Sequence, residues 1–344
     1  MGGASARPLK ILIVRVSSLG DVVHNMPMVA DILRHFPQAR IDWVVEEAYA
    51  PLVALNRGVH AVIPYALRRW RHRLAAAATR FEMASFVRAL RAQAYDFVFD
   101  TQGLFKTSVL MRLARLAAGG RRVGLGNATE GSGYEPISRI FHMDSVKVPA
   151  RTHAVLRARL VASAALGYVV DSPADFMLAA PAPAPAQTPA WLPAEPYAVF
   201  FHGTARAAKQ WPQERWVRLG SVLAQRGLPV LLAWGSMEEQ KAAHALAAQI
   251  PGAIVLPRLP MMEAVLLAQR ATLAVGVDTG LTHIAAAFNR PTIELYCDSP
   301  RWKTEGNWSP SIINLGHPGA PPESAEVEAA VAQLLGPQPQ VVLS

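Results

Sequence analysis

The sequence predicts an α/β protein with two domains, each built on a parallel β-sheet. Short apolar runs rich in β-branched residues alternate with helical patterns along the chain, as in Lys10–Val16 followed by Val22–Met26. The 344 residues suffice for two domains with separate cores. A stretch rich in Pro and Ala, residues 179–193, interrupts the alternation. We therefore predict an N-terminal domain over 1–178 and a C-terminal domain over 194–344, with 179–193 as the linker.

Composition excludes several classes of protein. Apolar residues make up 51% of the chain and charged residues 17%, which excludes a disordered protein. No apolar run approaches the roughly 20 residues that span a bilayer. The first nine residues lack the apolar core of a signal peptide, and the single cysteine, Cys297, excludes an internal disulfide. We expect a cytoplasmic protein.

The net charge of +9 is concentrated in the first half of the chain. Residues 1–170 carry 23 Lys and Arg against 11 Asp and Glu, a net charge of +12, while residues 171–344 carry a net charge of −3. A basic half of this kind attracts nucleic acid, an anionic membrane surface or a phosphorylated substrate. A solvated basic surface that serves solubility is the alternative.

The other elements follow the same alternation. Further strands are expected at 40–45, 61–64, 95–100, 197–202, 229–234, 253–256, 273–277 and 292–296, and further helices at 81–94, 107–117, 151–166, 211–225, 238–249, 261–270 and 280–288. The glycine-rich stretch from 119 to 145 indicates a mobile loop.

The loop after the first strand carries the first candidate for chemistry. Ser17-Ser-Leu-Gly-Asp21 leads from the strand into a helix, so Asp21 lies at the strand's carboxyl end, where ligands bind in open α/β sheets. A helix cap is an equally good interpretation of Asp21. One glycine is too few for a dinucleotide fingerprint. Asp100, Gln102 and Lys106 follow a later strand and are expected at the same edge, although Asp100 also suits a turn.

Residues 67–73 place four arginines around Trp70. The stretch suits either an exposed helix face or a surface that binds anions. We favour the second, because guanidinium groups bind phosphates and carboxylates through paired hydrogen bonds.

Two loops of the second half are suited to phosphate. The strand at 273–277 runs into Asp278-Thr-Gly-Leu-Thr-His283, where the start of a helix offers backbone N–H groups to an anion. His202-Gly-Thr-Ala-Arg-Ala-Ala-Lys209 follows another strand, and its lysine suits a diphosphate. A structural lysine on a loop is the alternative.

Four segments together resemble the bacterial lipopolysaccharide heptosyltransferases of glycosyltransferase family 9. These are, in order, Val14–Val22, Asp100–Lys106, His202–Pro212 and Val277–His283, and the resemblance covers nearly the whole chain. It implies the GT-B architecture, with two Rossmann-like domains facing across a cleft. It also implies transfer of L-glycero-D-manno-heptose from ADP-heptose to the Kdo of Kdo2-lipid A, with inversion at the anomeric carbon, at the cytoplasmic face of the inner membrane.

The resemblance also implies roles for single residues. Asp21 matches the proposed general base, and Lys209 is expected to stabilise the leaving diphosphate. Positions that match the donor site are Thr204, Lys209, Glu239, Asp278, Thr279, Gly280 and His283, with Glu239 holding the ribose. We assign the acceptor to Arg68, Arg69, Arg71, Gln102 and Lys106. Ala205, His72 and Tyr134 depart from residues common in the family.

We expect neither a cofactor nor a required metal ion, since the chain has no paired-carboxylate metal motif. Two other enzymes stay open: a transferase of the same family that acts on a later inner-core acceptor, and a sugar-nucleotide epimerase. A nucleic-acid-binding module is the alternative from another class. No helix-turn-helix, RNA-binding or zinc signature supports it, so we expect no nucleic-acid partner.

Overall fold

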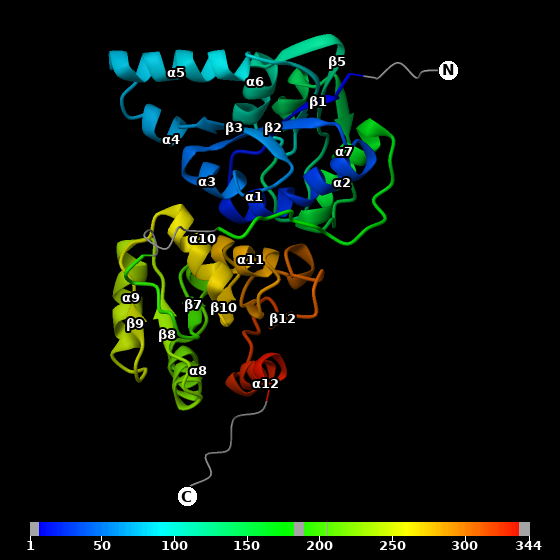
Figure 1. Ribbon diagram of the computed structural model, residues 1–344. Coiled ribbons are helices and arrows are strands. Elements are labelled where there is room, and N and C mark those ends of the chain that lie inside the picture. Colours follow the sequence, from blue (N-terminus) through cyan, green and yellow to red (C-terminus); the bar gives the residue numbers. More distant parts are fainter. Residues whose placement is uncertain (1–6, 182–188, 205, 337–344) are drawn as a thin grey trace, which may run out of the picture. The chain divides into compact units, whose positions relative to one another are not determined.

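The computed structural model describes residues 7–181, 189–204 and 206–336. By its internal contacts the chain divides into two compact units, Met1–Ala179 and Ala180–Ser344 (Figure 1). The central part of the expected linker, 182–188, and Ala205 lie outside the described residues.

The first unit is a six-stranded parallel sheet in the order β3-β2-β1-β4-β5-β6. Its strands are β1 (Lys10–Val14), β2 (Arg40–Glu46), β3 (Val59–Tyr65), β4 (Ala94–Asp100), β5 (Arg115–Leu125) and β6 (Asp144–Val146). Its helices are α1 (Leu19–Asn25), α2 (Pro27–His35), α3 (Ala50–Val53), α4 (Leu67–Trp70), α5 (Ala77–Leu90), α6 (Phe105–Leu113) and α7 (Ala154–Leu166), with 3₁₀ turns η1 (Glu47–Tyr49) and η2 (Pro136–Phe141). β1 is buried along nearly its whole length, as its apolar sequence predicts.

The second unit repeats this plan with the order β12-β11-β10-β7-β8-β9. Its strands are β7 (Ala198–Phe201), β8 (Val230–Leu232), β9 (Ile254–Val255), β10 (Leu273–Val277), β11 (Thr292–Leu295) and β12 (Ile312–Leu315). Its helices are α8 (Gln213–Gln225), α9 (Met237–Ala247), α10 (Met261–Arg270), α11 (Gly280–Ala287) and α12 (Ser324–Leu335), with η4 (Ala207–Lys209) and η5 (Arg301–Lys303). The prediction of two parallel sheets with helices is confirmed.

The order of the strands determines where ligands have room to bind. In the first unit the chain winds outward from β1 in one direction and from β4 in the other, and in the second unit from β7 and from β10. Between two such strands the crossover helices lie on opposite faces, which leaves a crevice at the carboxyl ends. We call these two positions, between β1 and β4 and between β7 and β10, the switch points of the sheets. The polar loops that follow these four strands all begin there.

The prediction of a mobile loop over 119–145 is wrong at both ends of that stretch, where β5 and β6 lie, although 126–135 is irregular as expected. The extension of the preceding helix to Ala117 is wrong. β5 pairs with β4, and β6 pairs with β5. Two glycines make this pairing possible, because a Cβ at Gly120 would lie 2.6 Å from the carbonyl oxygen of Tyr95 and one at Gly124 would strike the ring of His142. The glycines that indicated a loop therefore serve close packing within a sheet.

Candidate functional site

The first group of predicted site residues lies at the switch point of the first sheet. The side-chain Oε1 of Gln102, which follows β4, accepts a hydrogen bond from the backbone N–H of Val16 at 3.0 Å. Lys106 Nζ donates to Ser17 Oγ at 3.4 Å. The structure thus brings Gln102 and Lys106 to the loop that carries Asp21.

Asp21 uses its two carboxylate oxygens differently. Oδ2 accepts hydrogen bonds from the backbone N–H and the hydroxyl of Ser18, at 3.2 and 2.8 Å. Oδ1 lies 2.7 Å from Arg15 Nη2 and 4.0 Å from Arg157 Nη2. Burial opposes ionisation, but the charges of the two arginines outweigh it and hold the pKa of Asp21 well below its usual range. With 34% of its side chain exposed, Asp21 both caps α1 and presents an ionised carboxylate to solvent.

The two arginines beside Asp21 were not predicted as site residues. Arg15 is buried and donates from Nη1 to the carbonyl oxygen of Thr101 at 2.7 Å, which ties the end of β1 to the end of β4. Arg157 of α7 is buried and donates to Thr129 Oγ1 at 3.2 Å. Burial, helped by the charge of Arg15, lowers the pKa of Arg157 to about 10. Arg15 carried a signal in the sequence, because it is a charged residue inside the apolar run from 10 to 16.

Asp100 forms a turn and is not available to a ligand. It is fully buried. Its Oδ1 accepts from the backbone N–H groups of Gln102 and Gly103 at 3.0 Å, and its Oδ2 accepts from the hydroxyls of Thr107 and Ser108 at 3.0 and 2.7 Å. Of the two interpretations that the sequence left open for Asp100, the geometry supports the turn.

The arginine-rich stretch separates into a structural part and an available part. Trp70 is buried among Tyr65 and Phe86 and donates to Glu82 at 2.8 Å, so it belongs to the core, and only the arginines around it are available to an anion. Arg69 forms two 3.0 Å hydrogen bonds to Glu47 and one of 2.6 Å to Glu82. These contacts fix Arg69 against its own unit.

Arg68 has a different environment. Its guanidinium lies 5.9 Å from the centre of the Tyr49 ring. Burial raises the pKa of Glu46, and the charges of Arg68 and Lys106 oppose this shift, so both cations act on the carboxylate at the end of β2. Arg71 contacts the ring of His72 at 3.2 Å. Arg68 and Lys106 are therefore the cations associated with this sheet edge.

The second site lies at the switch point of the second sheet, directly after β10. Asp278 Oδ2 pairs with Lys209 Nζ of η4 at 2.6 Å, and its Oδ1 lies 3.1 Å from His283 Nε2. Burial opposes ionisation of Asp278, but the hydrogen bond and charge of His283, together with Lys209, hold its pKa well below the usual range. Thr279 and Gly280 open α11 beside this cluster. Asp278 thus fixes the ammonium group of Lys209 in position.

A buried carboxylate that the sequence analysis did not assign completes this cluster. Glu294 of β11 is fully buried; its Oε1 lies 3.0 Å from His283 Nδ1, and its Oε2 accepts from the hydroxyl of Tyr296 at 2.9 Å. Burial alone lowers the pKa of His283, but the carboxylates of Glu294 and Asp278 raise it to about 10. His283 is therefore an imidazolium held between two carboxylates. A lone Glu inside the apolar run of β11 was the available signal.

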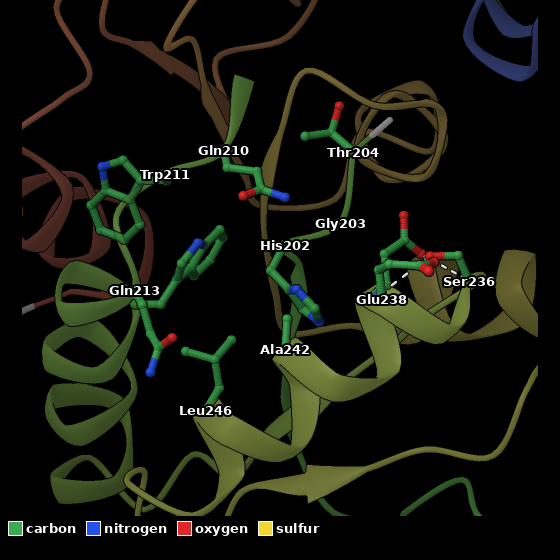
Figure 2. Close-up of a pocket in the computed structure, with 12 residues that line it drawn as sticks. His202, Gly203, Thr204, Gln210, Trp211, Gln213, Ser236, Glu238, Ala242 and Leu246 are labelled. Carbon is green, nitrogen blue, oxygen red and sulfur yellow. Dashed lines mark hydrogen bonds between the residues drawn. The ribbon is translucent and has the colours of Figure 1, made fainter. Parts of the chain in front are cut away.

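Thr204 and Glu239 line a pocket of about 180 Å³ in the second unit. Figure 2 shows its lining, with Thr204 at one end, His202 in the middle beside Ala242, and Leu246 of α9 at the other end. Glu239 Oε2 accepts from the backbone N–H groups of Gly235 and Ser236 at 2.7 and 3.2 Å, which caps α9. Burial lowers the pKa of His202, although the charge of Glu239 opposes this, so the imidazole is neutral at pH 7.

The described residues lack two kinds of feature. Within 7–181, 189–204 and 206–336, no three His, Cys, Asp or Glu side chains are grouped so as to hold a metal ion. In the same ranges no helix combines the length and apolar character needed to cross a bilayer.

The chain is similar to one known protein family and to several of its members. Residues 83–331 match the sequence profile of glycosyltransferase family 9 (heptosyltransferase). Lipopolysaccharide heptosyltransferase 1 of Pseudomonas aeruginosa is 37% identical over 311 residues, which cover 90% of this chain and 84% of the relative. The E. coli heptosyltransferase WaaC with ADP superposes with a TM-score of 0.80 at 32% identity, over 95% of this chain and 100% of that one. WaaC with ADP-2-deoxy-2-fluoro heptose gives 0.75 at 33%, over 95% and 99%.

The raised pKa of His283 predicts a stability that depends on pH. The folded state keeps this proton up to about pH 10, whereas an ordinary histidine loses it near pH 6.5. The free energy of unfolding should therefore fall as pH rises from about 6.5 to 10, the window in which the folded state binds the extra proton. Urea unfolding at several pH values in this window measures the slope. The variant His283→Gln should be less stable throughout and show a shallower slope; an unchanged slope would contradict the assignment.

Proposed function

The chain belongs to glycosyltransferase family 9, and we propose that it transfers L-glycero-D-manno-heptose from ADP-heptose to the Kdo of Kdo2-lipid A in synthesis of the lipopolysaccharide inner core. The resemblance found in the sequence is confirmed at the level of the family. Support for the donor comes from WaaC, whose structures contain ADP and an ADP-heptose analogue. The observation that carries the proposal is the ionised, partly exposed carboxylate of Asp21 at a sheet switch point.

We assign the acceptor to the first unit. Asp21 is the general base: as the acceptor oxygen bonds to the anomeric carbon, the hydroxyl proton passes to the carboxylate. Its depressed pKa keeps Asp21 ionised throughout the physiological pH range but also makes it a weak base, so it takes the proton as the acceptor hydroxyl becomes acidic in the transition state. Arg15 and Arg157 hold the carboxylate in place and keep it ionised. Arg68, Lys106 and Gln102 offer a cationic and polar surface to the carboxylate of Kdo.

We assign the donor to the second unit. The bond between the anomeric carbon and the diphosphate oxygen breaks, and negative charge grows on ADP. Lys209 and the first N–H groups of α11 stabilise that charge, and Thr204, Asp278, Thr279 and His283 complete the site. Glu239 holds the ribose. Attack on the face opposite the departing diphosphate inverts the anomeric configuration.

Two further points belong to the proposal. The acceptor carries lipid chains, so we place the protein in the cytoplasm at the surface of the inner membrane. The alternative enzyme is a heptosyltransferase II or III that acts on a later inner-core acceptor. Tyr134 bears on this choice, because its ring packs against Gly103 at a position where an arginine is common in the family.

The experiment that tests the function is a product assay with ADP-heptose and Kdo2-lipid A. Mass spectrometry should show an acceptor heavier by one heptose, together with ADP. Transfer to an acceptor that already carries heptose, and none to Kdo2-lipid A, would favour the alternative enzyme. An absence of transfer to both acceptors would refute the proposal.

Replacing Asp21 should remove the base. We expect Asp21→Asn to lower kcat by roughly a hundredfold or more, with little change in affinity for ADP-heptose. Asparagine keeps the shape of the side chain and can still accept the Ser18 hydrogen bonds, but it removes the counter-charge of buried Arg15, so the rate is normalised to the folded fraction of the variant. Single-turnover kinetics with saturating donor measure the effect. A variant that keeps its turnover per folded molecule would leave Asp21 with the capping role alone.

Lys209→Ala should weaken ADP-heptose binding and slow transfer together, because the diphosphate is charged in the ground state and gains charge in the transition state. Isothermal titration with ADP and steady-state kinetics separate the two effects. Arg218→Ala is the matched control, since this exposed residue of α8 pairs only with Glu328 among the contacts of the described chain. Unchanged donor affinity and unchanged kcat in Lys209→Ala would remove Lys209 from the donor site.

The neighbours Arg68 and Arg69 should respond differently to the same substitution. Arg68→Ala should raise the KM for Kdo2-lipid A several-fold, leave the KM for ADP-heptose near wild type, and flatten the loss of activity with added salt. Arg69→Ala should chiefly lower the melting temperature, since it removes contacts to Glu47 and Glu82. Equal increases of acceptor KM in both variants would show that the arginines bind the acceptor together. A defect limited to the donor KM would move the acceptor site elsewhere.

A further inference from the structure

An exposed apolar patch lies next to Lys106, one of the residues to which we assign the acceptor. Phe105 opens α6, and Ile137, Ile140 and Met143 lie in and just after η2. Their exposed fractions are 46%, 54%, 71% and 57%. We call these four residues the α6–η2 patch. Large apolar side chains gathered on one surface commonly mark an interaction site.

The local structure turns these side chains outward. Three residues make one turn of a 3₁₀ helix, so Ile137 and Ile140 lie on the same side of η2. Ser138 between them is fully buried. An ordinary surface turn would show the reverse pattern, with the serine outside and the isoleucines inside. The apolar side of η2 therefore faces solvent while the polar residue packs inward.

Hydrogen bonds and ring contacts hold the patch in place. The backbone N–H of Phe105 donates to Glu135 at 2.6 Å, and the N–H of Glu135 donates to the carbonyl oxygen of Gly103 at 2.9 Å. The rings of Phe105 and Phe141 lie 5.9 Å apart, and the N–H of Met143 donates to the carbonyl oxygen of Arg122 at 2.8 Å. The patch is thus built onto α6 (Figure 1) and the sheet.

Basic residues lie beside the patch residues along the chain. Arg139 is exposed between the two isoleucines, Lys106 follows Phe105, and Arg112 is exposed on α6. Of the nearby carboxylates, Asp144 is paired with Arg121 and Glu135 accepts the Phe105 N–H. Apolar side chains with cations among them are suited to an anionic bilayer, in which the side chains enter the interface and the cations meet lipid phosphates.

We propose that the α6–η2 patch is the surface by which this protein docks on an anionic lipid bilayer. The inference rests on the proposed function for its setting, since a lipid-linked acceptor requires an enzyme that works at a membrane. Lys106 follows Phe105 of the patch, and its Nζ donates to Ser17 in the loop that carries Asp21. Docking through the patch therefore brings the residues assigned to the acceptor to the bilayer surface.

Co-sedimentation of the full chain with vesicles tests the proposal. The wild type should bind vesicles of phosphatidylglycerol and phosphatidylethanolamine and bind weakly to vesicles of phosphatidylcholine alone. The double variant Ile137→Ser and Ile140→Ser should lose about tenfold or more in partitioning. Arg139→Gln should weaken binding to the anionic vesicles only. The matched control is Val169→Ser, an equally exposed apolar residue outside the patch, which should bind as the wild type does.

The outcomes are distinct from those that test the proposed function. The proposal would be overturned if the double variant bound vesicles as well as the wild type does. It would also be overturned if the wild type did not bind anionic vesicles. A double variant that instead changes the oligomeric state in light scattering would assign the patch to protein contacts and also overturn it. Transfer to a water-soluble, deacylated acceptor should proceed equally in the wild type and the double variant. Failure of that transfer in both proteins would count against the proposed function and leave the vesicle result standing.

Discussion

A fully parallel sheet with buried strands restricts the positions that polar side chains can occupy. Strands covered on both faces must be apolar along their length, and their backbone groups are consumed by the sheet, so polar side chains gather in the loops at the strand ends. In this protein the restriction acts twice. Asp21, Gln102 and Lys106 follow β1 and β4, and Lys209, Asp278 and His283 follow β7 and β10. Each cluster lies at the switch point of its sheet, where opposite crossovers leave a crevice.

Both clusters keep a carboxylate ionised in spite of burial. Desolvation favours the neutral acid, and in each case nearby cations reverse that preference: Arg15 and Arg157 for Asp21, His283 and Lys209 for Asp278. The purposes differ. Asp21 retains exposed surface, which the proposed role as a base requires, whereas the side chain of Asp278 is only 10% exposed and is engaged in holding Lys209. The same electrostatic arrangement supports the proposed reacting group in one unit and a positioning group in the other.

The sequence was sufficient for the fold and for the placement of most site residues, because both depend on local pattern. Apolar runs of four to seven residues predicted the central strands, and the loops after them contained the polar residues. It failed where tertiary packing overrides local pattern. Gly120 and Gly124 were interpreted as loop residues, because their close contacts with Tyr95 and His142 cannot be seen in the sequence. The burial of Trp70 was not predicted, because it packs on Tyr65 and Phe86 in the folded chain.

The residues that sequence reasoning missed share one property: their role is to hold another residue. Arg15 and Glu294 interrupt apolar strands, and each would be costly to bury without a partner of opposite charge. Such a residue in a predicted core strand therefore implies a counter-charge elsewhere in the fold, although the sequence alone does not identify it. Here the counter-charges are Asp21 and His283, both of which were predicted as site residues from their own loops. A charged residue in a predicted core strand and a residue of opposite charge in a loop at a strand end thus belong to the same cluster. Considering the two together would have added Arg15 to the cluster of Asp21 and Glu294 to the cluster of His283.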